Sequence, residues 1–208
     1  MKATQLAFCA LCLLVAACGG SVAGDVPEAE LKLEMNEALA VAHLRSLVNA
    51  QTHAQSLGIV DADNDGVGEY LFLGELAGTD KPRASGAGTK MPLLHPESCR
   101  VSSTGFLESN GYLFRVFLPG VNGVDVGEGP GGGGEVEADG AEEDWVAYAW
   151  PMQHGTTGVR TFVVTADGTI YGKDVTRNSG AGSPKADSAF ELAGDGGRAV
   201  ADGWQAVD

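Results

Sequence analysis

The sequence predicts an α+β fold in which one long N-terminal amphipathic helix packs on an antiparallel sheet of about four strands. Two observations support this. Apolar residues between positions 36 and 57 recur every three or four residues, which is the period of one helix face. Apolar runs of strand length follow after residue 110, and two of them flank Asp167-Gly168, a strong hairpin signal. A helix followed by successive strands is typical of α+β folds.

The predicted helix covers residues 36–57. Asn36 suits the N-cap because its side chain can accept a bond from a free backbone N–H, and Glu37 places negative charge in the first turn. Gly58 follows the helix where a left-handed C-cap is expected. Asp25 and Pro27 form an alternative start signal nearer the N-terminus. The stripe that should face the sheet consists of Ala40, Val41, Leu44, Leu47, Val48, Gln51, Ala54 and Leu57.

The strands are predicted at residues 112–118, 145–150, 161–166 and 169–172. The apolar run 70–78 is ambiguous between a strand and a helical turn. Residues 78–104 and 121–144 are rich in Gly and polar residues, and we expect mobile loops there. A short helix is expected from Ser183-Pro184 to Leu192, and Trp204 is expected to pack back on the domain.

The first 17 residues have the features of a signal peptide. Lys2 precedes an apolar run that is too short to cross a bilayer. The run ends in VAAC at residues 15–18, which resembles the lipobox of bacterial lipoproteins. This resemblance implies that Cys18 carries a diacylglycerol lipid, with acyl chains such as palmitate, and becomes the mature N-terminus. Gly19 at the next position then implies sorting to the outer membrane.

The alternative is an ordinary secretory signal, cut near Ala17 or Ala23. Both interpretations predict export. The lipoprotein interpretation divides the chain into a signal peptide (1–17), the lipidated cysteine with its tether (18–26) and a single domain (27–208). Cys99 is then the one cysteine left in that domain, so an intrachain disulfide is excluded. We expect an incidental thiol there rather than a catalytic one.

The composition is strongly acidic, with 28 acidic and 13 basic residues and a net charge of −15. Such a chain repels phosphate backbones, which excludes nucleic acid as a partner. The same charge favours cation binding.

The best candidate site is the segment DADNDGVGE, residues 61–69. Carboxylates stand at alternate positions and Gly66 follows them, which matches the first six positions of a calcium loop. Position twelve is Phe72 instead of the glutamate of an EF-hand. The alternative is a solvated turn that ends the helix. The predicted Ca²⁺ ligands are Asp61, Asp63, Asp65, the carbonyl of Val67, and Glu69.

Other patterns carry less chemistry. Gly127, Gly129 and Gly132 spell GxGxxG, but acidic residues follow, so phosphate binding is excluded. His43 and His53 are ten residues apart and share no helix face, so they are a poor metal pair. Aromatic residues in the strands are expected to form core beneath the helix, with a sugar- or peptide-binding face as the alternative. These are Tyr112, Phe114, Trp145, Tyr148 and Trp150.

Two segments resemble the globular part of type IV pilins and type II secretion pseudopilins. NEALAVAHLRSLVNAQ, residues 36–51, resembles the pilin spine helix, and RTFVVTADGTIYG, residues 160–172, resembles the closing hairpin. The chain also resembles planctomycete-type exported proteins that join such a helix to a DxDxDGxGEY turn. A prepilin peptidase site is missing, and a lipobox stands in place of the apolar half of the pilin helix. The resemblance therefore implies a pilin-like head on a lipid tether rather than a filament subunit.

These observations favour a non-catalytic lipoprotein of the cell envelope that contacts an envelope or secretion-system protein. The alternative is a calcium-dependent adhesin or glycan-binding module. A more remote alternative is an exported hydrolase built from His154 and the acidic turn.

Overall fold

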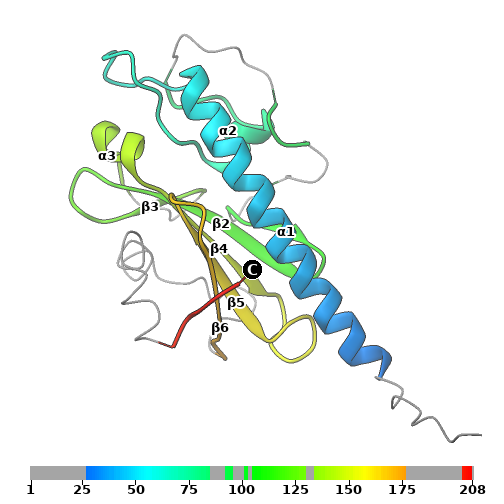
Figure 1. Cartoon of the computed structure of the whole chain (residues 1–208). Coiled ribbons are helices and arrows are strands. Elements are labelled where there is room, and N and C mark those ends of the chain that lie inside the picture. Colours follow the sequence, from blue (N-terminus) through cyan, green and yellow to red (C-terminus); the bar gives the residue numbers. More distant parts are fainter. Residues whose placement is uncertain are drawn as a thin grey trace, which may run out of the picture.

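A computed structural model describes residues 27–84, 92–95, 101–102, 105–129, 134–176 and 203–207. One long helix lies against an antiparallel sheet, and two short helices sit near its C-terminal end (Figure 1). The helices are α1 Glu28–Leu57, α2 Leu73–Ala77 and α3 Ala138–Glu143. The strands are β1 Leu107–Ser109, β2 Tyr112–Leu118, β3 Val126–Gly127, β4 Val146–Pro151, β5 Arg160–Thr165, β6 Ile170–Asp174 and β7 Gln205–Ala206.

Helix α1 is unbroken over 30 residues and begins at the earlier of the two predicted starts. Pro27 is its N-cap, and Glu28 and Glu30 place acidic charge in the first turn. The prediction of Asn36 as N-cap is wrong. Asn36 is buried within the helix, and its Nδ2 donates to the Thr157 carbonyl at 2.9 Å. The predicted C-cap is confirmed, because Gly58 is left-handed with φ 56°.

Within the described residues the sheet has seven strands instead of the predicted four or so. Its order is β1-β2-β4-β5-β6-β7, with β3 also paired to β2, and every pairing between these strands is antiparallel. The predicted hairpin is confirmed as β5–β6, where Val163 lies opposite Tyr171. The strands that the sequence did not indicate are β1, β3 and β7, which are two or three residues long. Strands this short show no alternation that a pattern could detect.

The packing of α1 on the sheet is confirmed. Leu44 and Leu47, at the middle of the helix, are fully buried. They belong to the same core as Tyr112, Phe114 and Val116, which are alternate residues of β2 and so point to one face of the sheet. The prediction that the strand aromatics form core beneath the helix is confirmed for Tyr112, Phe114 and Trp145. It is wrong for Tyr148 and Trp150, which are buried in a different core.

A second core lies on the opposite face of the sheet, which the sequence analysis did not predict. It is built from the other residues of β2 and β4, such as Leu113, Phe117 and Trp150. Trp204 packs there as predicted, with its ring centroid 6.4 Å from that of Tyr148. Burial on both faces explains why β2 and β4 are almost continuously apolar instead of alternating.

The segments predicted as mobile loops contain defined structure. Residues 121–144 include β3 and α3, and residues 78–84 turn back on α2 through Arg83. The ambiguous run 70–78 contains α2, which covers five of its residues. The signal region with Cys18, together with Cys99 and the helix predicted at 183–192, lies outside the described residues.

Candidate functional site

The acidic turn begins where α1 ends and is held by its own side chains. Asp63 Oδ1 accepts a hydrogen bond from the Asp65 amide at 3.2 Å, and Asp65 Oδ1 accepts one from the Val67 amide at 2.7 Å. Asn64 and Gly66 adopt positive φ values of 64° and 94°. Asn and Gly tolerate this conformation, so the residue types at these two positions account for the shape of the turn.

Gly68 fixes this turn against the last turns of α1. A Cβ atom at Gly68 would lie 2.1 Å from the carbonyl oxygen of Gln55. Only glycine therefore permits this approach of the two backbones.

Three predicted ligands gather in this turn. One carboxylate oxygen from each of Asp61, Asp63 and Asp65 lies within 4.8 Å of the others. The structure adds a second group that shares one member, because Asp63, Asp139 and Glu142 also meet within 4.8 Å. Together these five side chains form what we call the acidic cluster. It joins the end of α1 to α3, two segments about 75 residues apart in the chain.

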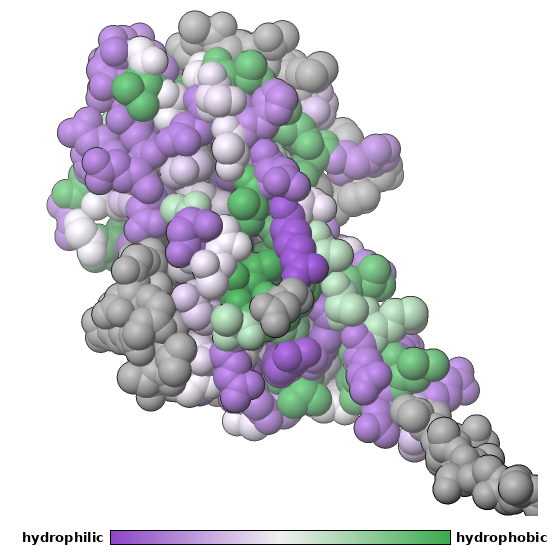
Figure 2. All heavy atoms as spheres, in the orientation of Figure 1, coloured by the Kyte–Doolittle hydropathy of each residue, from purple (hydrophilic) through white to green (hydrophobic). Residues whose placement is uncertain are grey.

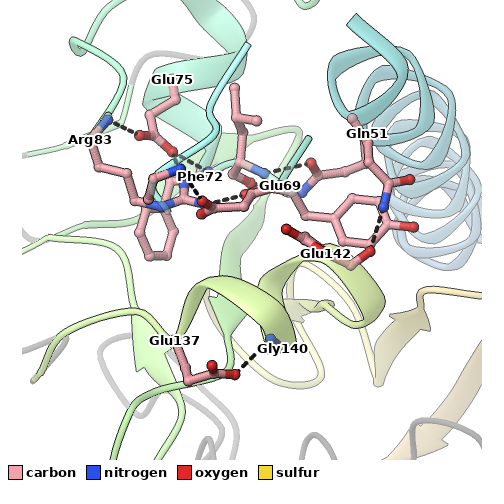
Figure 3. Close-up of polar contacts among 12 residues, drawn as sticks. Gln51, Glu69, Phe72, Glu75, Arg83, Glu137, Gly140 and Glu142 are labelled. Carbon is pink, nitrogen blue, oxygen red and sulfur yellow. Dashed lines mark hydrogen bonds and ion pairs between the residues drawn. The ribbon is translucent and has the colours of Figure 1, made fainter. Parts of the chain in front are cut away.

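Helix α3 is positioned by contacts of its backbone. Glu137 caps it by accepting from the Gly140 amide at 2.6 Å (Figure 3). The Ala141 side chain is fully buried, and its carbonyl accepts from the Tyr70 amide at 2.8 Å. The Gln55 amide of α1 donates to the Glu142 carbonyl. These contacts present Asp139 and Glu142, three residues apart on one helix face, to the acidic turn.

The cluster is electrostatically unfavourable without a cation. The pKa of Asp139 is raised, mainly by the negative charge of Glu137 and to a smaller extent by a hydrogen bond to Asp63. The pKa of Glu142 is also raised. The main cause is partial desolvation, and the negative charges of Asp65 and Asp63 contribute less. Asp61 Oδ1 and Glu142 Oε1 are buried and have no hydrogen-bond partner among the described residues. Carboxylate oxygens in this state suit a hard divalent cation such as Ca²⁺.

Glu69, the fifth predicted ligand, is placed elsewhere. Its side chain is fully buried, with Oε1 accepting from the Ala62 amide at 2.6 Å and Oε2 lying 2.7 Å from Arg83 Nη2. Glu69 therefore stabilises the turn through the backbone of Ala62 and belongs to neither group of the acidic cluster. Position nine of the calcium-loop pattern is thus used for structure.

Arg83 connects Glu69 to α2. Its Nη1 lies 2.7 Å from Glu75 Oε2, and its Nη2 also donates to the Tyr70 carbonyl at 2.6 Å (Figure 3). Glu75 in turn accepts from the Phe72 amide at 2.9 Å. A buried carboxylate requires a partner of this kind, because desolvation of an unpaired charge is costly.

Gln51 explains why a polar residue stands in the apolar stripe of α1. It is fully buried, its Nε2 donates to the Leu71 carbonyl at 2.7 Å, and its Oε1 accepts from the Leu71 amide at 2.9 Å. The chain that leaves the acidic turn is thereby bonded to the helix (Figure 3).

Asp139 and Glu142 were not predicted as site residues, because they lie in a stretch whose composition predicts a mobile loop. The i, i+3 spacing of these acids behind Glu137 was the available signal for a short capped helix. His154, the residue that the remote hydrolase hypothesis combined with the acidic turn, instead pairs with Asp174 at 2.7 Å.

A protein-family model described as a protein of unknown function (DUF2950) matches residues 90–191, just under half of the chain. This stretch contains β1 to β6 and α3, whereas α1 and the acidic turn lie outside it. The chain matches no curated protein and no solved structure. Within the described ranges, each helix is too short or too polar to span a bilayer.

Proposed function

We propose that this protein is a non-catalytic lipoprotein of the cell envelope. A diacylglycerol on Cys18 would hold it at the outer membrane, and its pilin-like head would contact an envelope or secretion-system protein. The observation that carries the proposal is the VAAC sequence at residues 15–18, which follows an apolar run of signal-peptide length.

The position of α1 supports the proposal. The helix starts at Glu28, so only residues 19–27 separate it from Cys18. At 3.3–3.6 Å per extended residue, this tether reaches about 30 Å at most. A lipid on Cys18 would therefore keep the N-terminal end of α1 near the membrane surface. The packing of a long helix on an antiparallel sheet supports the pilin-like description of the head.

Metabolic labelling with palmitate tests the anchor. The full chain expressed in bacteria should incorporate label and partition into detergent, and globomycin should block its processing. Cys18→Ser should abolish labelling, whereas Cys99→Ser should leave it unchanged. Labelling that persists in Cys18→Ser, or a mature form beginning near Ala23 without lipid, would overturn the proposal.

A second candidate function is a calcium-dependent binding module, such as an adhesin or glycan-binding head. The specific support is the acidic cluster, in which two chain segments converge and two buried carboxylate oxygens are unpartnered. Position twelve of the loop is Phe72 instead of the bidentate Glu of an EF-hand, so we expect weak affinity, on the order of 10⁻⁴–10⁻³ M as in extracellular modules.

Calorimetric titration of the full chain with CaCl₂ tests this candidate. Asp63 belongs to both groups of the cluster, and Asp63→Asn removes its charge while keeping the oxygen that accepts from Asp65. This variant should lose the binding heat. Glu108→Gln, an exposed change on β1, should retain it. Equal heats in the two variants would contradict a cation site at the cluster.

A further inference from the structure

Helix α1 carries apolar side chains on two faces. One face packs on the sheet, whereas the other is exposed along the N-terminal half. Leu31 and Met35 are 58% and 56% exposed, and Leu39 beside them is 40% exposed. Figure 2 shows green and pale green side chains gathered over the N-terminal end of α1, which projects beyond the sheet in Figure 1. Neighbouring large apolar groups in water indicate an interaction surface.

The spacing of these residues defines a short seam. Leu31, Met35, Ala38 and Ala42 are separated by four, three and four residues and are all exposed; we call them the outward seam. Steps of four and three are the heptad spacing by which one helix packs along another. At 100° per residue, Leu31 and the buried Ala40 differ by about 180°, so the outward seam faces directly away from the core.

Charged residues bound the outward seam at both ends. One step of three before Leu31 stands Glu28, and one step of three after Ala42 stands Arg45. Both are exposed. The order along this face is therefore acid, large, large, small, small, base. Reversing that order gives base, small, small, large, large, acid, which complements it position by position.

We propose that the outward seam binds a second copy of this chain, with the two α1 helices antiparallel about a two-fold axis between residues 36 and 37. Leu31 then packs against Ala42 of the second copy, and Met35 packs against Ala38 of the second copy. Each large side chain meets a small one, which lets the helices approach closely. Glu28 and Arg45 of the second copy pair across each end of the interface.

The same pattern disfavours other occupants. In a parallel pair, Glu28 would meet Glu28 and Arg45 would meet Arg45, so like charges would face each other at both ends. A bilayer surface would have to accept Glu28, Glu30 and Glu34 beside the apolar residues, and acidic side chains are repelled by anionic headgroups. The seam is about 18 Å long at 1.5 Å per residue, so the association is weak and reversible.

Sedimentation of the full chain in mild detergent tests the interface. The mass should shift from monomer to dimer between about 1 and 500 µM protein, the range of weak complexes. Leu31→Lys should weaken association by about tenfold or more, since it places charge in an apolar layer. Asn49→Lys is the matched control, because residue 49 lies 18 residues, or about five full turns, beyond residue 31 and points the same way. It should leave association unchanged.

Charge reversal tests the antiparallel arrangement separately. Arg45→Glu should weaken association by about tenfold, because two acids then face each other at each end. Adding Glu28→Arg to this variant should restore association. A chain that stays monomeric over the whole range would overturn the proposal, as would Leu31→Lys and Asn49→Lys behaving alike. Failure of the double variant to recover would overturn the antiparallel register. Loss of flotation with zwitterionic vesicles in Leu31→Lys, without dimers in the parent, would assign the seam to a bilayer instead.

Discussion

The two halves of α1 differ in what covers them. The C-terminal half packs against the sheet, the acidic turn, α2 and α3, and its polar residues Gln51 and Gln55 bond to Leu71 and Glu142. The N-terminal half is covered on one side only and leaves Leu31 and Met35 in solvent. Burial thus makes the C-terminal half the stable attachment of the helix. Exposure makes the N-terminal half available for an intermolecular contact.

The largest difference between the halves should appear on truncation of a leucine. Leu47→Ala removes a fully buried side chain and should lower the free energy of unfolding by about 3–4 kcal/mol. Leu31→Ala should change it by less than about 0.5 kcal/mol, since Leu31 is mostly exposed in the monomer. Urea unfolding of both variants at low protein concentration measures this. A large loss in Leu31→Ala would show that its face is already covered.

Breaking an ion pair should also destabilise the protein more near the C-terminal half of α1 than near its N-terminal half. Arg83→Met leaves the fully buried Glu69 without its cation and should cost about 3 kcal/mol. Arg160→Met removes the partner of Glu37, whose side chain is 12% exposed. Glu37 keeps its hydrogen bonds from the backbone amides of residues 159 and 160, and the Arg160 side chain is 46% exposed, so the loss should be about 1 kcal/mol. Thermal unfolding of the two variants gives the comparison. Equal losses would mean that burial does not govern these pairs.

The stability of the region around α2, beside the C-terminal half of α1, should also depend on pH. Burial raises the pKa of Glu128 to about 7 even though its carboxylate accepts from the Leu73 and Gly74 amides. Its pKa in the unfolded chain is near 4.5, so between these values the native state binds more protons. The stability contribution of this group is therefore complete below about pH 4.5 and is lost as the pH rises through 7.

This dependence is measurable by urea unfolding between pH 5 and pH 8. The free energy of unfolding should fall by about 2–3 kcal/mol across the range, which is the order of a shift of this size. Glu128→Gln should make the curve flatter. A parent curve that rises with pH would contradict the assignment of a protonated Glu128.

The smallest expected difference concerns two glycines beside the acidic turn. Gly68→Ala places a Cβ against the Gln55 carbonyl and should cost about 2 kcal/mol. Gly58→Ala meets nothing within 4 Å but keeps a positive φ, so it should cost about 1 kcal/mol. Denaturant midpoints of the two variants compare them. A smaller loss at Gly68 would mean that the turn can move away from α1.

Features with a local cause were predictable from the sequence. The helix stripe, the Gly58 cap and the hairpin at Asp167-Gly168 depend on the period of a few neighbouring residues and on backbone conformations that only some residues adopt. The start of α1 was misplaced because Asn36 has the chemistry of a cap while its side chain is used for a distant contact with Thr157.

The candidate site was predictable only in part. The spacing of Asp61, Asp63 and Asp65 predicted the acidic turn. The same calcium-loop pattern also predicted Glu69 as a ligand. Burial beside Arg83 removes Glu69 from that role, and Arg83 lies in a stretch whose composition predicted a loop.

A reader of the sequence can predict a long amphipathic helix, a set of antiparallel strands and an acidic turn after the helix, because each follows from short-range periodicity and turn chemistry. Three features become visible only in the folded domain: α3 brings Asp139 and Glu142 to that turn, the sheet is buried on both faces, and a second apolar face of α1 remains in water. These depend on contacts between segments far apart in the chain, where packing and desolvation select one arrangement among many that the local pattern allows.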